Sequence, residues 1–193
     1  MTLSGGPLFR DGFPRLVLLA CHDLRTPLAT VYGFARTLSE DGELDERTQE
    51  FVGMIESAAE QMKELLDRLG LIACISGGRW EPVMREADTL ELARSADERI
   101  AVAGRGEVVY TAPEELEHAL QELAAAVLRH GSVDRVTWTV AGRTFELDPV
   151  APAAAAVIAD DEPKDLGGLA ARLVVETLGG SVAVDGGTLR VVV

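Results

Sequence analysis

The sequence predicts an α+β fold in two parts: an antiparallel helical hairpin that forms a dimeric four-helix bundle, and then an α/β two-layer sandwich. Two patterns predict it. Up to residue 77, apolar residues recur at spacings of three and four along two long segments, as in helices that pack lengthwise. After the Gly77-Gly78 pair, short alternating segments are interspersed with shorter helical ones. We therefore place the domains at residues 1–77 and 78–193.

The helical hairpin follows from the first pattern. The segment connecting the two helices, residues 40–43, is short and polar, and Asp45 is an expected N-cap for the second helix. The residues that recur at spacings of three and four form an apolar stripe along each helix, which we call its seam. Additional apolar residues beside each seam make the stripe wider than one partner helix can cover, so we expect two copies to associate. The seam residues are Val17, Cys21, Leu24, Leu28, Val31, Ala35 and Leu38, then Phe51, Ile55, Ala58, Met62, Leu65 and Leu69; the additional residues are Leu16, Leu19, Val52 and Leu66.

The second domain contains three expected helices and three pairs of strands. Pro113 near the start and Gly131 near the end support the central helix. We expect the strands to form antiparallel hairpins, and we assign residues 151–159 to neither class. The expected helices are 88–99, 113–129 and 166–178, and the expected strands are 100–103, 108–110, 135–140, 143–147, 182–184 and 189–193.

Composition and charge narrow the range of functions. Hydrophobic residues make up 47% and charged residues 26% of the 193, as in ordinary globular proteins. The net charge of −14 argues against binding to nucleic acid or to an anionic membrane surface. The apolar run 16–21 is too short to span a bilayer, and no signal-peptide pattern is present, so we expect a cytoplasmic protein. Cys21 and Cys74 are expected to be buried thiols, and no Cys/His spacing indicates a metal site.

A set of polar residues on the first helix is the candidate site for catalysis. His22 stands one position beyond the seam, which directs it towards the flank of the bundle. Asp23 can orient the imidazole, and Thr26 lies one turn further on the same face, where its hydroxyl could hold a water molecule. Pro27 lacks an N–H and weakens the helix beside the histidine. A neutral imidazole is a suitable nucleophile for phosphoryl transfer.

Residues 18–38, with the run His-Asp-Leu-Arg-Thr-Pro-Leu at 22–28, resemble the phosphoacceptor box of sensor histidine kinases. The likeness continues through residues 65–69 and 78–82. In that family the box lies on the first helix of a dimerisation and histidine-phosphotransfer domain. The resemblance implies that His22 is phosphorylated, that Asp23 is the adjacent acid–base residue and that Thr26 serves phosphatase activity.

The order of elements in residues 88–193 is similar to the ATP-binding domain of histidine kinases, but its nucleotide boxes are altered. Glu122 and Ala126 stand where asparagines that hold magnesium are expected, and a methyl group cannot coordinate a cation. The adenine-binding box corresponds to residues 148–152 and lacks both glycines. Asp165 places negative charge where a phosphate should lie. We therefore expect a degenerate ATPase-like domain, in which Glu122 is a solvated helix residue and His118 and His130 are structural.

Together these features predict a phosphorelay histidine phosphotransferase, most similar to the ChpT type. It would pass a phosphoryl group between response-regulator aspartates through His22, without ATP-dependent kinase activity. We expect no cofactor bound by this chain, with Mg²⁺ supplied by the partner receiver domain. The expected partners are a second copy, response-regulator receiver domains and, as a further candidate, a hybrid histidine kinase. Two alternatives stay open: a divergent but active sensor-type kinase, and a non-catalytic dimeric scaffold that binds response regulators.

Overall fold

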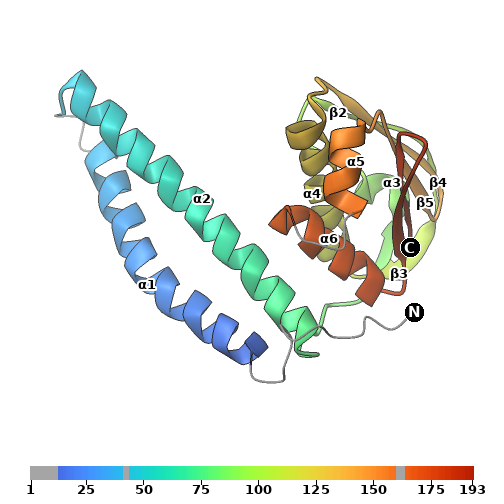
Figure 1. Cartoon of the computed structure of the whole chain (residues 1–193), viewed down its shortest axis with the longest axis horizontal. Coiled ribbons are helices and arrows are strands. Elements are labelled where there is room, and N and C mark those ends of the chain that lie inside the picture. Colours follow the sequence, from blue (N-terminus) through green and yellow to red (C-terminus); the bar gives the residue numbers. More distant parts are fainter. Residues whose placement is uncertain (1–12, 41–43, 160–163) are drawn as a thin grey trace. The chain divides into compact units, whose positions relative to one another are not determined.

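The computed structural model describes residues 13–40, 44–159 and 164–193 (Figure 1). The chain divides into two compact units, Met1–Trp80 and Glu81–Val193. The sequence placed this boundary between residues 77 and 78. The first unit is helical, and the second combines helices with two sheets.

The helical unit is an antiparallel hairpin of α1 (Phe13–Glu40) and α2 (Glu46–Ser76). Asp45 caps α2 as predicted, because its side chain accepts a hydrogen bond from the Thr48 backbone N–H at 3.0 Å. Hydrogen bonds from Thr48 also lower the pKa of Asp45. Residues 41–43 of the predicted connection lie outside the described residues.

The single seam predicted for α1 is divided between two faces. Cys21 and Ala35 are buried and Leu28 is half-buried, and this set recurs at every seventh position. On α2, Val52 and Ala59 are buried with the same spacing. Val17 is also half-buried, whereas Leu24, Val31 and Leu38 are roughly half exposed, and helical periodicity places these three beside the buried set. We call the exposed seam residues of both helices the outer apolar face: Leu24, Val31 and Leu38, with Phe51, Ile55, Met62 and Leu65.

The second unit is built on a five-stranded sheet with the order β2-β4-β5-β7-β6. A separate antiparallel pair joins β1 to β3. Strands β4 to β7 pair antiparallel as expected, whereas β2 pairs parallel with β4, because the chain crosses over through β3 and α4 between them. The strands are β1 (Arg85–Asp88), β2 (Ile100–Gly106), β3 (Val108–Thr111), β4 (Val136–Gly142), β5 (Thr144–Asp148), β6 (Ser181–Asp185) and β7 (Thr188–Val192).

Three helices cover one face of this sheet: α4 (Pro113–Gly131), α5 (Pro152–Ala159) and α6 (Leu166–Thr177) (Figure 1). The core between the two layers is almost entirely apolar, with Trp138 edge-on to Phe145 and both fully buried. Pro113 begins α4 as expected, and Ala112 holds the N-cap position. This layer brings the C-terminal end of α4 against the N-terminal end of α6.

Two predictions of secondary structure were wrong. Residues 88–99 form only the one-turn helix α3 (Thr89–Leu92), because Ser95 and Asp97 then accept hydrogen bonds from backbone N–H groups two residues ahead and compete with a helix. Residues 151–159, assigned to no element, form α5. Pro152 occupies its first position, where no N–H is needed, and a run of alanines continues it.

Candidate functional site

His22 lies on α1 with its side chain 79% exposed. The preceding residue, Cys21, is 1% exposed and contributes to the buried seam of the hairpin. A turn of about 100° per residue along α1 then directs His22 away from the interior of the hairpin. The same periodicity places His22 on the side of α1 opposite Leu24, Val31 and Leu38. The histidine is therefore open to solvent and separate from the outer apolar face.

Asp23 is paired with this histidine. His22 Nδ1 and Asp23 Oδ1 are 3.2 Å apart, and the aspartate side chain is 67% exposed. When the ring proton is on Nδ1, that nitrogen donates to the carboxylate and Nε2 keeps a free lone pair. The arrangement favours the tautomer in which the outer ring nitrogen is the nucleophile.

Thr26 and Pro27 complete the predicted group. Thr26 is exposed and stands four residues after His22, so the two side chains share one face of α1. Its backbone carbonyl accepts a hydrogen bond from Thr30 Oγ1 at 3.2 Å. Pro27 lies inside α1, which continues to Glu40. Proline removes the N–H that would otherwise bond the Asp23 carbonyl, yet it does not end the helix.

An ion pair beside this face was not predicted. Arg25 Nη2 donates to Asp67 Oδ1 at 2.8 Å and so joins α1 to α2. Arg25 also lies over Gly70, since a Cβ built there would be 3.4 Å from Nη2. Both side chains are about half exposed, so the pair contributes little stability in solvent. The pair connects the two helices within one turn of His22.

In the second unit, residues from two of the three altered nucleotide boxes lie together, those of α4 and those at the start of α6. A Cβ built on Gly167 would lie 2.0 Å from Glu122 Oε2, so this glycine makes room for the carboxylate. A Cβ built on Gly168 would lie 3.9 Å from the Ala126 side chain. Glu122 is only 7% exposed, so its assignment as a solvated residue was wrong. The sequence of α4 contained no signal that a carboxylate would be buried against α6.

Asp165 is the N-cap of α6 and the centre of a charged cluster. Its Oδ1 accepts from the Gly168 backbone N–H at 2.8 Å, and its Oδ2 accepts from Arg129 Nη2 at 2.9 Å. His130 Nε2 also lies 2.9 Å from Oδ2. Burial alone would raise the pKa of Asp165, but these hydrogen bonds lower it to about 2. The structural role expected for His130 is consistent with this contact.

This arrangement does not fit a nucleotide phosphate. At the N-terminus of α6, the Gly168 backbone N–H, one of the groups that could bind a phosphate oxygen, already donates to the carboxylate of Asp165. A second carboxylate, Glu122, lies against Gly167 on the same turn. Within residues 13–40, 44–159 and 164–193, no group of three or more His, Cys, Asp or Glu side chains is arranged to hold a metal ion.

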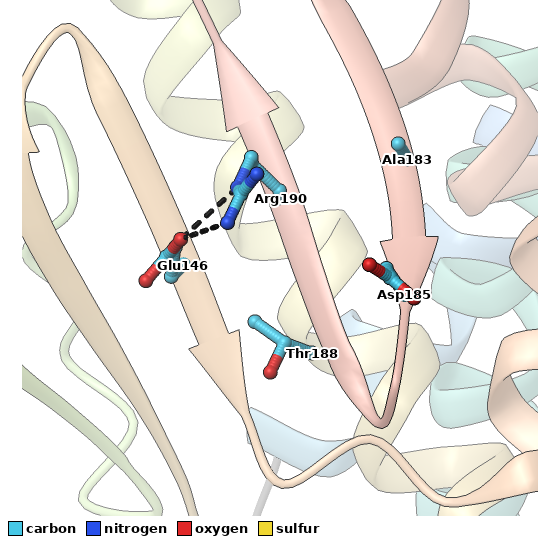
Figure 2. A pocket seen from close by; sticks show the side chains of 5 residues that line it. All are labelled: Glu146, Ala183, Asp185, Thr188 and Arg190. Atoms are coloured by element: carbon cyan, nitrogen blue, oxygen red, sulfur yellow. Dashed lines mark hydrogen bonds and ion pairs between the residues drawn. The ribbon is translucent and has the colours of Figure 1, made fainter.

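A depression on the face of the sheet opposite the helices is a weaker candidate for a functional site. It is lined by Glu146, Ala183, Asp185, Thr188 and Arg190, from β5, β6 and β7 (Figure 2). Arg190 Nη2 donates to Glu146 Oε1 at 2.7 Å across the strands, as Figure 2 shows. The arginine side chain is 60% exposed and already paired, as expected on the solvated face of a sheet.

Comparison with known proteins identifies the hairpin. Residues 15–78 match the family model of the His Kinase A (phospho-acceptor) domain. The sensor histidine kinase TrcS of Mycobacterium tuberculosis is 31% identical over an alignment of 155 residues that covers 75% of this chain and 30% of TrcS. The helices of the described residues include none that is long and apolar enough to cross a membrane.

Two solved structures share the fold. Full-length ShkA in complex with AMPPNP aligns over 92% of this chain and 44% of its own length, with a TM-score of 0.69 and 19% identity. The Acinetobacter baumannii histidine kinase AdeS aligns over 88% of this chain and 95% of its own, with a TM-score of 0.57 and 15% identity. The chain thus spans less than half the length of TrcS and of ShkA. These matches support a histidine-kinase core in this chain, with the phospho-acceptor hairpin at residues 15–78.

Proposed function

We propose that this chain is a histidine phosphotransferase that relays a phosphoryl group between response-regulator receiver domains through His22, without using ATP. The observation that carries this proposal is the exposed His22–Asp23 pair on a hairpin matching the phospho-acceptor domain. An imidazole 79% exposed can enter the active site of another protein, as a relay requires. The Asp165 carboxylate, which already accepts the Gly168 N–H at the N-terminus of α6, disfavours a nucleotide phosphate there and supports relay without ATP.

The transfer is a displacement at phosphorus. His22 Nε2 attacks the phosphoryl group of a receiver aspartate, so the P–O bond to that aspartate breaks as the N–P bond forms. The aspartate leaves as a carboxylate, and the ring carries the phosphoryl group on Nε2 and its proton on Nδ1. In the onward step a second receiver aspartate attacks, the N–P bond breaks and the ring is neutral again. Magnesium, expected with the receiver, neutralises phosphate charge.

Asp23 and Thr26 act on this cycle differently. The carboxylate of Asp23 holds the proton on Nδ1 and stabilises the positive charge of the phosphorylated ring. Thr26 lies one turn away, where its hydroxyl can position a water molecule against a receiver aspartyl phosphate. We assign Asp23 to transfer and Thr26 to hydrolysis.

The proposed active form is a homodimer. The outer apolar face exposes seven large hydrophobic side chains, from Leu24 at 54% to Leu38 at 44%, along both helices. A monomer would leave this stripe in water, whereas two copies packed as a four-helix bundle would bury it. His22, on the other side of α1, would stay accessible to receivers in that dimer.

Two other functions have specific support. The likeness to the sensor kinase TrcS, and to ShkA solved with AMPPNP, favours an active kinase with a divergent nucleotide site. The exposed apolar face also suits a dimeric scaffold that binds receivers without transferring phosphate. The intact group of His22, Asp23 and Thr26 favours transfer over a scaffold, which would not need it.

The test is to incubate the purified chain in parallel with ³²P-labelled phospho-receivers and with γ-³²P-labelled ATP. We expect label on the chain from a receiver and none from ATP. Label from ATP would instead establish the kinase, and receiver binding without label would establish the scaffold. His118→Gln is the matched control for His22→Gln, because His118 is also an exposed helical histidine, with its side chain 62% exposed.

A further inference from the structure

One face of α4 meets the first turn of α6 through charged side chains. Glu122, Ala126, Arg129 and His130 follow one another at helical spacing and all lie against residues 165–168. Arg129 and His130 stand in the last turn of α4, where helix carbonyls favour positive charge. Asp165 stands at the N-terminus of α6, where free N–H groups favour negative charge. The Asp165 carboxylate therefore joins the two helix ends, because it pairs with Arg129 of α4 and caps the N-terminus of α6.

The second carboxylate explains the glycine beside it. In the resembled ATP-binding domain, glycines of this loop let the backbone approach a phosphate. Here Gly167 is in close contact with Glu122 Oε2, and any side chain at position 167 would collide with that oxygen. The buried carboxylate of this chain thus takes the space that the glycine leaves open. Gly168 likewise lets α6 approach the methyl group of Ala126.

We propose that Asp165 and Glu122 form an internal lock, in which two carboxylates of the chain take the place of nucleotide phosphate and hold α6 on α4 without any ligand. This deepens the ATP-independent part of the proposed function by naming how the nucleotide site is closed. An incoming phosphate would meet the negative charge of Asp165, the Glu122 oxygen beside Gly167 and a Gly168 N–H group that is already bonded. The sandwich would then keep its α4–α6 contact in the absence of nucleotide.

Thermal unfolding of the full chain tests the Asp165 half of the lock, with tryptophan fluorescence as the signal because Trp138 lies in the core of the sandwich. Asp165→Asn keeps a capping side chain but loses the charge, and Arg129→Gln removes its cationic partner. We expect each to lower Tm by about 3–6 °C and the double variant to lower it no further than the larger single change. Asp97→Asn is the control, since Asp97 pairs only with Arg99 two residues away.

The Glu122 half of the lock is tested by enlarging the side chain at position 167 with and without the side chain of Glu122. Gly167→Ala would ordinarily stabilise a helix, but here the new methyl group meets Glu122 Oε2. We expect Gly167→Ala to lower Tm in the natural sequence and to raise it in a Glu122→Ala background. The same sign in both backgrounds would show that the carboxylate does not occupy this space, and would overturn this half of the lock.

Two other results would overturn the proposal. One is that Asp165→Asn and Arg129→Gln lower Tm additively, or lower it no more than Asp97→Asn does. The other is a rise in the Tm of the natural sequence with millimolar Mg-ATP, because a closed site cannot be stabilised by nucleotide. These measurements need no receiver and no labelled phosphate, so failure of the lock is distinguishable from failure of relay through His22.

Discussion

His22 Nδ1 lies 3.2 Å from Asp23 Oδ1, and both side chains are more than two-thirds exposed. This contact leaves the outer ring nitrogen of His22 free to react. Asp23→Asn replaces the anion with a neutral amide that no longer stabilises a charged ring. We expect transfer from a phospho-receiver to slow about 10- to 100-fold, within the range for acid–base groups. Rapid-quench measurement of labelled His22 gives the rate.

Asp67→Asn is the control for that experiment. It removes an acid from the same hairpin by breaking the pair with Arg25, and that pair is about half exposed. An exposed ion pair contributes about 0–1 kcal/mol, so folding and transfer should both persist. Equal slowing by the two substitutions would mean that general negative charge, and not the contact with His22, supports the transfer.

The outer apolar face predicts the effect of a single charge on assembly. Ile55 is 48% exposed on this face of the hairpin. Ile55→Asp would place an unpaired carboxylate within the proposed dimer interface, and we expect a folded monomer at micromolar concentration by sedimentation. Ser57→Asp adds the same charge to another face of α2 and should leave the dimer intact. A monomeric natural sequence would contradict the four-helix bundle.

Leu28 distinguishes assembly from folding. It is half-buried in the seam between α1 and α2, so Leu28→Asp puts the charge inside the hairpin and not on its outer face. We expect this variant to lose helical circular dichroism as well as dimerisation, whereas Ile55→Asp keeps the helical signal. Similar spectra for the two variants would argue that the two faces of α1 do not differ in role.

Thr26→Ala separates hydrolysis from transfer. The substitution removes the hydroxyl one turn from His22 and leaves the imidazole and Asp23 unchanged. His22 should still take label from a phospho-receiver at a similar rate, while any water-mediated dephosphorylation of the receiver should fall. The two rates can be followed in one reaction by the loss of label from receiver and the release of inorganic phosphate. Loss of His22 labelling would contradict the assigned division of roles.

Asp165 predicts a pH dependence of stability. Its hydrogen bonds hold the pKa at about 2, below the ordinary value of 3.8. The charged carboxylate therefore stabilises the fold fully above about pH 4, and that contribution is lost as the pH falls towards 2. We expect the Tm difference between the natural sequence and Asp165→Asn to be present at pH 5 and to shrink from pH 4 to 2. A Tm difference that stays constant from pH 5 to 2 would mean that the charge of Asp165 does not contribute to stability.

The main elements of the fold could be predicted because their signals are local. The heptad spacing of α1 and α2, Asp45 as an N-cap and Pro113 at the start of α4 all depend on nearby residues. The short α3 and the unexpected α5 show where local signals conflict. Asp97 and Ser95 favour side-chain bonds to the backbone, and Pro152 marks a helix start although proline usually disfavours helices.

What depends on distant contacts could not be predicted. The seam of α1 predicted one packed face, and only the arrangement in space separates Cys21 and Ala35 from Leu24 and Val31. Similarly, the sequence indicated negative charge at Asp165, but its bonds to Arg129 and His130 span more than thirty positions. The burial of Glu122 follows from the approach of α6, which no spacing within α4 encodes.

The most direct test of the account is a relay between two receiver domains. A ³²P-labelled phospho-receiver and an unlabelled second receiver are mixed with the natural sequence, with His22→Gln or with the control His118→Gln. We expect the natural sequence and His118→Gln to move label to the second receiver through a labelled intermediate. We expect His22→Gln to fold and dimerise normally but to move none. Relay by His22→Gln at the natural rate would contradict the assignment of His22 as the phosphoryl carrier.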